Sequence, residues 1–276
     1  MKKSSIYNTL LDLDGLFNAA SDKIIVFTPE LFDIYSKHKE QPDSLAAVHP
    51  ELFGSLVENG MIVDEETDEP AAVIDRWKQQ DNDRRYFQII INPTLQCNLR
   101  CWYCYENHDA KTVMTDEVRE SVIKLVDDKV CQAELEEILI GFFGGEPLMY
   151  FRECVQPILE HASTECEKNG KLMRINFTTN GVLITGKVIE VLKEITAYAV
   201  SFQITLDGNR FRHNDVRYTS SNNGTYDIII NNIKALLAVG FQVNIRCNYT
   251  EKITVVLAIL LKIFMIFLMN IRVTYQ

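Results

Sequence analysis

From residue 87 onward, short apolar runs alternate with longer stretches of helical pattern. The apolar runs have the length and bounds of buried strands, and they cover residues 88–92, 138–143, 173–179, 199–206 and 241–247. The stretches between them predict helices over residues 115–130, 151–169, 185–195 and 224–239. The first of these helices begins at Thr115, a capping residue followed by two acidic residues. This alternation predicts an α/β fold with a parallel sheet, either open or closed into a barrel.

The first 85 residues have a different pattern, which predicts a separate small module. Apolar residues at helical spacing follow the start signal Thr28-Pro29-Glu30, and a second helix is expected from Pro50 to Asn59, ending at Gly60. Met61-Ile62-Val63 predicts a short strand, and residues 71–85 predict a linking helix. The order helix, helix, strand is typical of a small winged-helix-like unit.

The composition is that of an ordinary globular protein and narrows the range of partners. Hydrophobic residues make up 47% and charged residues 24% of the 276 residues. The net charge of −10, without a basic face, argues against general nucleic-acid binding. Seven cysteines behind a start that lacks a signal-peptide core indicate reduced thiols in the cytoplasm, not a disulfide framework.

The strongest chemical signal is the set of three cysteines Cys97, Cys101 and Cys104, which follows the first predicted strand. On a loop, the spacing C-x3-C-x2-C lets three thiolates each hold one iron of a [4Fe–4S] cluster, which leaves the fourth iron open to a small molecule. A zinc site needs a closed set of four ligands or three plus water, and His108 would be the fourth ligand here. Three unrelated buried cysteines are the other alternative, and the spacing favours the cluster.

Unusual residues also follow the other predicted strands. Gly144-Gly145-Glu146-Pro147 follows the second strand, and Asn180 follows the third. Asp207 follows the fourth strand, and Asn248 follows the fifth. The carboxyl ends of parallel strands lie on one rim, where α/β barrels build their active sites. We therefore expect these residues and the cysteines to share one site.

The cysteine spacing, the aromatic Tyr103 before the last cysteine and the Gly-Gly-Glu-Pro turn together resemble the radical S-adenosylmethionine (SAM) superfamily. The resemblance implies two cofactors, a [4Fe–4S] cluster and SAM, with SAM bound to the open iron through its amino and carboxylate groups. It implies that Tyr103 lies against the adenine, with a packing aromatic as the alternative. It also implies that Gly144, Gly145, Glu146 and Pro147 bind SAM.

In this interpretation of the turn, the two glycines let the backbone approach the ligand and Pro147 stiffens the exit. Glu146 would accept a hydrogen bond from the SAM ammonium. Taken alone, the four residues are only a tight turn, and their place after the second strand favours the SAM-binding role.

Further positions match motifs of the same family. Asn180 lies where the family places a residue near SAM, or it is a turn asparagine in a left-handed conformation. Thr205 and Asp207 match the fourth-strand motif of members that modify peptides and proteins, and residues 213–217 continue that resemblance. Arg217 is the candidate partner of the SAM carboxylate because guanidinium groups pair well with carboxylates, with a surface salt bridge as the alternative. Asp207 is the candidate catalytic residue, although its role as a base is not assigned.

The resemblance covers about residues 1–250 and is nearest to the peptide-maturase branch, the SPASM-type relatives of the anaerobic sulfatase-maturating enzymes. It implies a partial TIM-like (β/α) barrel over residues 86–251, preceded by a peptide-recognition-like module and linker over residues 1–85. Such a module would bind a leader peptide by strand addition, and a simple N-terminal cap on the barrel is the alternative.

Residues 252–276 depart from the pattern of this branch, whose members usually add a cysteine-rich domain with auxiliary clusters. No cysteine follows Cys247, and residues 253–271 are almost wholly apolar apart from Lys262. We expect a frameshifted or truncated reading frame here, which leaves the barrel incomplete. The alternatives are a membrane span, which Lys262 makes costly, and a buried barrel helix, which would normally show a polar face.

The function implied by the resemblance is a radical SAM enzyme that modifies a peptide or protein substrate and uses a low-potential electron donor. An anaerobic sulfatase-maturating enzyme is the nearest alternative. A truncated remnant that binds a cluster or a leader peptide without turnover is another. No nucleic acid is expected as a partner, and a membrane is expected only if residues 253–271 form a span.

Overall fold

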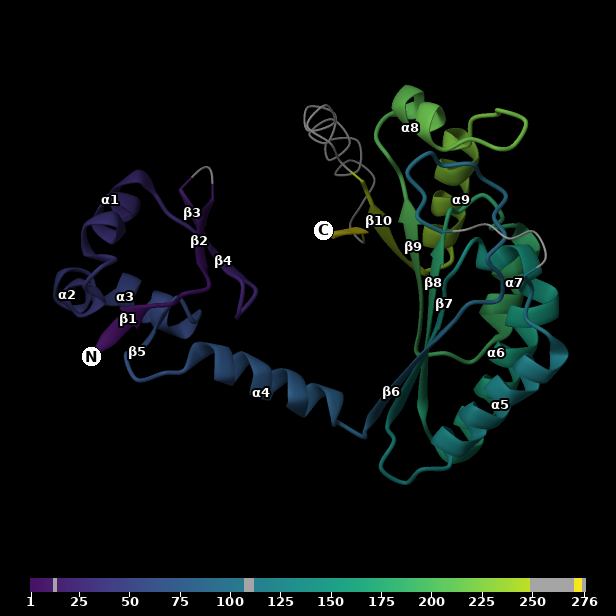
Figure 1. Cartoon of the computed structure of the whole chain (residues 1–276), viewed down its shortest axis with the longest axis horizontal. Helices are drawn as coiled ribbons and strands as arrows, with labels where there is room; N and C mark the ends of the chain where they lie inside the picture. The colour runs from purple at the N-terminus through teal and green to yellow at the C-terminus, as the bar shows by residue number, and fades with distance from the viewer. Residues whose placement is uncertain (12–13, 107–111, 249–270, 275–276) are drawn as a thin grey trace. The chain divides into compact units, whose positions relative to one another are not determined.

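The structure is a computed structural model that describes residues 1–11, 14–106, 112–248 and 271–274. The chain divides into two compact units, Met1–Asp83 and Arg84–Gln276 (Figure 1). His108 and most of the apolar tail, for which a frameshift was predicted, lie outside the described residues. Within the described part of the chain, no helix is long and apolar enough to cross a membrane.

The first unit combines two small antiparallel sheets with short helices. One sheet has the order β2-β3-β4, and in the other β1 pairs with β5. The elements are β1 (Lys2–Ser4), β2 (Asn8–Leu11), β3 (Gly15–Asn18), β4 (Lys23–Val26), α1 (Pro29–His38), α2 (Pro42–Val48), α3 (Pro50–Glu58), β5 (Ile62–Asp64) and α4 (Glu69–Asp81). Leu16, Tyr35 and Leu56 are buried in a core that belongs to this unit alone.

The sequence predicts the helices of this unit better than its strands. The helix behind Thr28, the helix from Pro50 and the strand near Ile62 are confirmed as α1, α3 and β5. Thr28 caps α1, since its hydroxyl accepts a hydrogen bond from the Leu31 N–H at 3.4 Å. Strands β1 to β4 were not predicted, because three or four residues show too little alternation to reveal a strand.

The second unit is a parallel sheet whose strands alternate with helices, in the order β6-β7-β8-β9-β10-β11. The elements are β6 (Tyr86–Ile91), α5 (Asp116–Val130), β7 (Glu137–Phe142), η1 (Pro147–Tyr150), η2 (Phe151–Val155), α6 (Gln156–Asn169), β8 (Leu172–Thr179), α7 (Gly186–Glu194), β9 (Ala199–Thr205), α8 (Arg210–Val216), α9 (Tyr226–Ala238), β10 (Gln242–Arg246) and β11 (Ile271–Thr274).

The predicted α/β fold with a parallel sheet is confirmed. The predicted strands match β6 to β10. Three of the predicted helices match α5, α7 and α9, and the one predicted over residues 151–169 is η2 followed by α6. Two elements go beyond the prediction: α8 follows β9, and β11 pairs with β10 where the sequence suggested that the barrel stops at its fifth strand.

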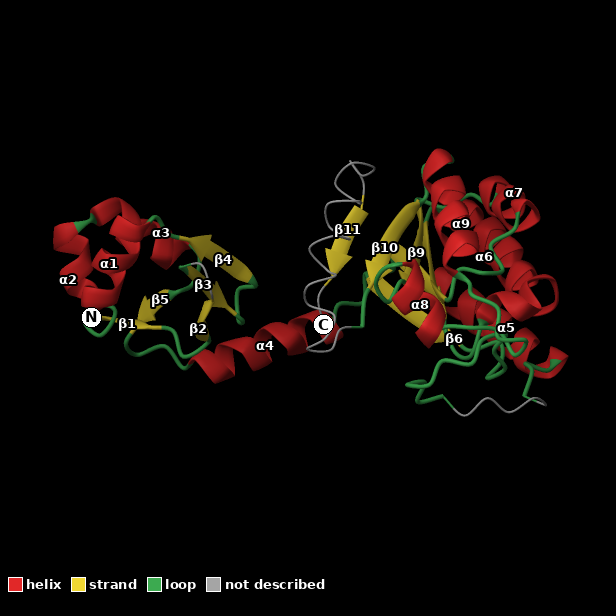
Figure 2. Cartoon of the chain, turned by 90° about the horizontal axis from the view of Figure 1, so that it is seen from above, coloured by secondary structure: helices red, strands yellow, loops and turns green. Residues whose placement is uncertain are grey.

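The two faces of this sheet differ in chemistry. Helices α5, α6, α7 and α9 lie together on one face (Figures 1 and 2), and apolar side chains fill the layer between them and the sheet. Phe142, Phe177 and Phe202 occupy matched positions of neighbouring strands and stack with centroid distances of 5.3 and 5.1 Å. Alternate positions such as Gln203 and Asn244 point to the opposite face and are half-buried. The sheet therefore has one face for the core and one polar face at which a site can form.

Two segments meet at the carboxyl ends of β6 and β7, and their contact positions the candidate site. We call residues 92–104 the cysteine loop and residues 143–147 the Gly-Gly-Glu turn. The Gly145 N–H donates to the Thr94 carbonyl at 3.0 Å, and the Glu146 N–H donates to the Gln96 carbonyl at 2.7 Å. These backbone hydrogen bonds place the turn directly against the loop.

Only glycine fits this contact. A Cβ at position 145 would lie 2.1 Å from the Gln96 carbonyl oxygen, and a Cβ at position 144 would lie 2.6 Å from that of Thr94. Gly144 also has a φ of 108°, a conformation that L side chains rarely adopt. The sequence suggested that the glycines make room for a ligand. The structure shows a further reason for the glycines, because they make room for the backbone of the cysteine loop. Their contact with SAM stays a prediction.

We predict that Gly145→Ala lowers the free energy of unfolding by about 1–3 kcal/mol, because the added methyl group forces the loop and the turn apart. The measurement is urea unfolding beside Gly186→Ala, where a Cβ would meet no atom within 4 Å. If both variants are as stable as the parent chain, the close contact between the turn and the cysteine loop is refuted.

Candidate active site

The three cysteines of the predicted cluster lie together on the cysteine loop. Cys97 and Cys101 are half-buried, Cys104 is exposed, and all three are free thiols. The Cys97 sulfur accepts hydrogen bonds from the Leu99 N–H at 3.4 Å and from the Asn180 side-chain amide at 3.7 Å. Donors aimed at a cysteine sulfur favour its thiolate, the form that binds metal.

Burial disfavours the thiolate forms of Cys97 and Cys101, and a nearby positive charge favours them. Burial raises the pKa of Cys97, and it raises that of Cys101 to about 11, with Arg217 acting in the opposite direction. Coordination to a metal deprotonates a thiol outright. Among the described residues, no group of three His, Cys, Asp or Glu side chains converges to hold a metal ion. A [4Fe–4S] cluster does not need three ligands that converge on one ion, because each cysteine holds its own iron.

Glu146 joins the loops that follow β7 and β8. Its fully buried carboxylate accepts hydrogen bonds from the Thr179 hydroxyl at 2.8 and 3.0 Å and from the Asn180 N–H at 2.8 Å. It also accepts the Leu148 N–H at 3.1 Å and so caps η1, which Pro147 begins. Burial raises the pKa of Glu146, while these donors favour its ionised form. The carboxylate thus holds two loops together. Its contact with the SAM ammonium stays a prediction.

Asn180 connects the loop after β8 to the cysteine loop. Its amide donates to the Cys97 sulfur and, at 2.7 Å, to the Asn98 side-chain oxygen. Its own side-chain oxygen accepts the Val182 N–H at 3.0 Å. The left-handed residue of this turn is Gly181, with a φ of 82°, so the interpretation of Asn180 as a left-handed turn residue is wrong.

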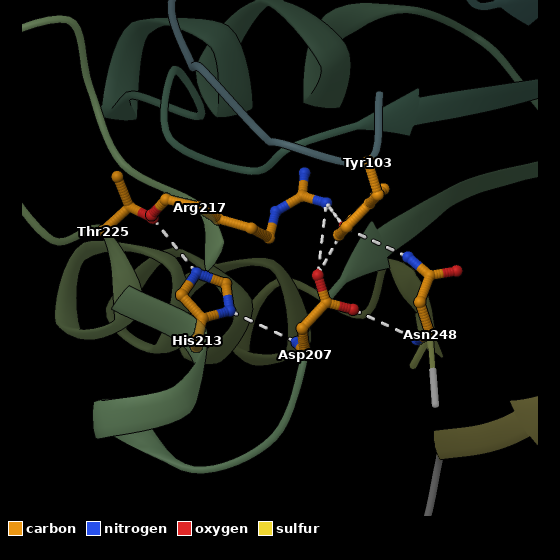
Figure 3. Close-up of polar contacts among 6 residues, drawn as sticks. All are labelled: Tyr103, Asp207, His213, Arg217, Thr225 and Asn248. Carbon is orange, nitrogen blue, oxygen red and sulfur yellow. Dashed lines mark hydrogen bonds and ion pairs between the residues drawn. The ribbon is translucent and has the colours of Figure 1, made fainter. Parts of the chain in front are cut away.

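Tyr103, Asp207, Arg217 and Asn248 form a second polar group (Figure 3). The Arg217 Nη1 donates to the Tyr103 hydroxyl at 2.6 Å and lies 3.7 Å from the Asp207 Oδ2. The Tyr103 hydroxyl donates to the same Asp207 oxygen. Asn248 completes the group, since its amide donates to the Tyr103 oxygen at 3.1 Å and its backbone N–H to the Asp207 Oδ1 at 3.0 Å.

This group is buried and carries charge. Arg217 is 7% and Asp207 is 1% exposed, so the alternative of a surface salt bridge for Arg217 is wrong. Burial raises the pKa of Tyr103 well above its usual range, and the negative Asp207 adds to the effect. The phenol therefore keeps its proton and ties the cysteine loop to Asp207. The adenine contact of the Tyr103 ring stays a prediction.

One atom of the group lacks a partner. Among the buried side-chain nitrogen and oxygen atoms of the described residues, only the Nε of Arg217 makes no hydrogen bond. An unsatisfied donor on a buried cation is rare in folded proteins, and it indicates a place for an anionic group.

The candidate residues thus fall into two connected sets, one around Cys97, Asn180 and the Gly-Gly-Glu turn and one around Arg217. Thr205 lies at the end of β9, half-buried, in register with Arg246 of β10. Sequence reasoning missed Thr179 and Asn98, whose partners lie 33 and 82 residues away in the chain. It also missed Thr225, whose partners His213 and Arg217 lie 12 and 8 residues away. Its only signal for His213 was membership of the segment 213–217 that resembles the family motif.

Known proteins resemble parts of the chain. Radical SAM cyclopropyl synthase TigE from Paramaledivibacter caminithermalis is 35% identical over 156 residues, which are 51% of this chain and 30% of that protein. GTP 3',8-cyclase from Rhodopirellula baltica is 33% identical over 118 residues, 42% of this chain and 29% of that enzyme. The chain therefore spans less than a third of the length of these two relatives.

A solved structure of anSMEcpe with bound AdoMet has the same fold, with a TM-score of 0.58 and 24% identity. The match covers 68% of this chain and 50% of that one. The model of the radical SAM superfamily matches residues 91–255, which include the cysteine loop, the Gly-Gly-Glu turn and the group around Arg217. The chain belongs to the radical SAM superfamily, whose members use a [4Fe–4S] cluster and SAM.

Proposed function

We propose that the chain is a radical SAM enzyme that modifies a peptide or a protein. Cys97, Cys101 and Cys104 would hold the [4Fe–4S] cluster, and Arg217 would receive the carboxylate of SAM. The observation that carries this proposal is the contact of the cysteine loop, through Tyr103, with a buried arginine that has a free donor. When bound, a reduced cluster and SAM together supply a 5'-deoxyadenosyl radical, which abstracts hydrogen from a substrate.

The residues present fit these cofactors. Three thiols lie on one loop with a hydrogen-bond donor already aimed at one sulfur, which suits a cluster ligand. The free Nε and the planar fork of Arg217 suit a carboxylate, which pairs with guanidinium through two parallel bonds. Asp207 balances the charge of the buried arginine at 3.7 Å.

The chain itself then positions and encloses the reactants. Glu146 and the two glycines of the turn hold the cysteine loop in place at the end of the sheet. Thr205 and Asp207 lie at the end of β9, where a substrate on the polar face of the sheet would meet SAM. We keep Asp207 as the candidate catalytic residue, and a low-potential donor would deliver the electron.

The first unit supports a peptide as the substrate class. Strand β4 is an edge of its sheet, with the Ile24 and Val26 side chains 59% and 71% exposed. The antiparallel register places Leu11, which is 41% exposed, on the same face as Val26. An edge strand with outward apolar side chains suits an extended peptide that adds as a further strand.

The first prediction from this proposal is that the anaerobically reconstituted chain cleaves SAM. With iron, sulfide, SAM and dithionite, we expect 5'-deoxyadenosine from the parent chain and from Cys131→Ala, which removes an exposed cysteine outside the site. Cys97→Ala, Cys101→Ala and Cys104→Ala are expected to give none, because each removes one iron ligand. The product is quantified by chromatography.

Two other results would contradict the prediction of SAM cleavage. A bound cluster without 5'-deoxyadenosine would favour the non-catalytic remnant over the enzyme. Equal product from the parent chain and the three loop variants would refute the assignment of the cluster ligands.

A second prediction concerns the substrate class. Peptides that carry cysteine or serine, peptides encoded by short reading frames beside the gene, and GTP are each incubated with the active chain. We expect a mass change in a peptide and none in GTP. A change confined to the cysteine or serine peptides would favour the sulfatase-maturating alternative. Conversion of GTP with every peptide unchanged would contradict the proposed substrate class.

A third prediction tests the edge strand β4. With a peptide that is modified, Val26→Asp is expected to raise KM about tenfold, because a charge replaces an apolar contact of the added strand. SAM cleavage without peptide should not change. Val48→Asp is the matched control, since Val48 is 56% exposed on α2, away from the edge. An equal KM for both variants would remove β4 from the binding site.

A further inference from the structure

The segment from Asp207 to Arg217 carries both members of the buried ion pair, and one histidine lies between them. Asp207 precedes α8, Arg217 ends it, and His213 is on the helix. The Arg217 backbone N–H donates to the His213 carbonyl at 2.7 Å. The His213 side chain is fully buried and makes hydrogen bonds with both of its ring nitrogens (Figure 3).

These hydrogen bonds fix the tautomer of His213. Its Nδ1 lies 3.3 Å from the backbone nitrogen of Asp207, whose N–H is always a donor, so Nδ1 must accept. The proton is therefore on Nε2, which donates to the Thr225 hydroxyl oxygen at 3.0 Å. The Thr225 hydroxyl in turn donates to the Arg217 carbonyl at 3.0 Å. A single directed chain of hydrogen bonds thus joins the backbone of Asp207 to the backbone of Arg217.

The Thr225 hydroxyl can join these hydrogen bonds because another residue caps α9. Thr225 is the N-cap of α9, where a threonine hydroxyl normally accepts an N–H of its own helix, but it makes no such bond. Instead the Asn214 side-chain oxygen accepts the N–H groups of Thr225 and Tyr226 at 2.9 and 3.0 Å.

Gly224 makes this exchange possible. A Cβ at position 224 would lie 2.4 Å from the side chain of Asn214, so a larger residue would exclude it. The cap of α9 therefore comes from α8, and the Thr225 hydroxyl turns toward His213 and Arg217.

We propose that His213 and Thr225 are positioning residues that hold Asp207 and Arg217 in the arrangement that receives the carboxylate of SAM. The inference rests on the proposed function, because it takes Arg217 to be the partner of that carboxylate. Neither residue touches SAM in this account. They act through two backbone positions, one on each side of the ion pair.

The burial of His213 agrees with a fixed role in place of proton transfer. Burial lowers the pKa of His213 to about 3, and the nearby Arg217 adds to the effect. A protonated ring would place a second N–H against that of Asp207. Its other neighbours are Thr225 and the Tyr226 ring, edge-to-face at 5.7 Å. The neutral ring thus keeps one acceptor and one donor in place across the physiological range.

The test measures SAM binding by equilibrium dialysis with the reconstituted chain, without turnover. His213→Asn keeps an amide near Nδ1 and loses the bond to Thr225, whereas His213→Gln keeps an amide near Nε2 and loses the bond to Asp207. Thr225→Val removes the hydroxyl. Each is expected to weaken SAM binding about tenfold, the effect of one lost hydrogen bond. Thr225→Ser retains the hydroxyl and should bind within about twofold of the parent chain.

Asp215→Asn is the matched control, because Asp215 lies on the same helix and pairs with Arg212 at the surface. Thermal unfolding separates positioning from a merely structural role. Folded variants of His213 and Thr225 that bind SAM as tightly as Asp215→Asn would overturn the proposal. A parent chain that binds a cluster but no SAM would instead refute the proposed function.

A second measurement applies even if the variants do not fold. The nitrogen chemical shifts of His213 in the 15N-labelled parent chain, with the cluster oxidised, report which ring nitrogen carries the proton. We expect a neutral ring protonated on Nε2 at pH 6. A charged ring, or a proton on Nδ1, would overturn the proposed chain of hydrogen bonds.

Discussion

The contact between the backbone of the Gly-Gly-Glu turn and that of the cysteine loop is the constraint on which the site depends. Two hydrogen bonds, from Gly145 to Thr94 and from Glu146 to Gln96, fix the loop to the end of β7. The same glutamate places its buried carboxylate beneath the loop after β8. The start of the cysteine loop is therefore positioned by the paired strands β6, β7 and β8, and the Arg100 N–H donates to the Tyr218 carbonyl at 2.8 Å farther along the loop.

Two side chains connect the cysteine loop to the other loops at the carboxyl ends of the strands. Asn180 joins the loop after β8 to Cys97, and Tyr103 joins the cysteine loop to Asp207 beyond β9. The buried Arg217 lies near the Asp207 carboxylate and near the thiol of Cys101, which becomes negative when it ionises. Its positive charge favours the thiolate form of Cys101 and is itself balanced by Asp207. Positioning and charge are thus provided by the same few residues.

Much of this arrangement could be predicted from the sequence, for a physical reason. Buried parallel strands leave continuous apolar runs, so β6 to β10 were found within two residues of their ends. The placement of Cys97, Glu146, Asn180 and Asp207 at one rim followed from that topology. The prediction was poor where local pattern is weak, as in the short strands β1 to β4.

The sequence also left the roles of single side chains undetermined. The hydrogen bonds of Glu146 were not predicted, because its partners Thr179 and Asn180 lie 33 and 34 residues away in the chain. Tyr103 meets Asp207 across 104 residues. Such contacts depend on how strands are packed, and no periodicity along the chain records them. The glycines of the turn were likewise recognised, but their close contact with the backbone of the cysteine loop was not.

The central claim is that the three cysteines hold a [4Fe–4S] cluster whose open iron binds SAM beside Arg217. The most direct measurement is electron paramagnetic resonance of the reconstituted, dithionite-reduced chain, recorded without and with SAM. The account predicts the signal of a reduced [4Fe–4S] cluster that changes when SAM is added, because the open iron gains new ligands. A signal that SAM leaves unchanged, or a reconstituted chain without a cluster signal, would contradict it.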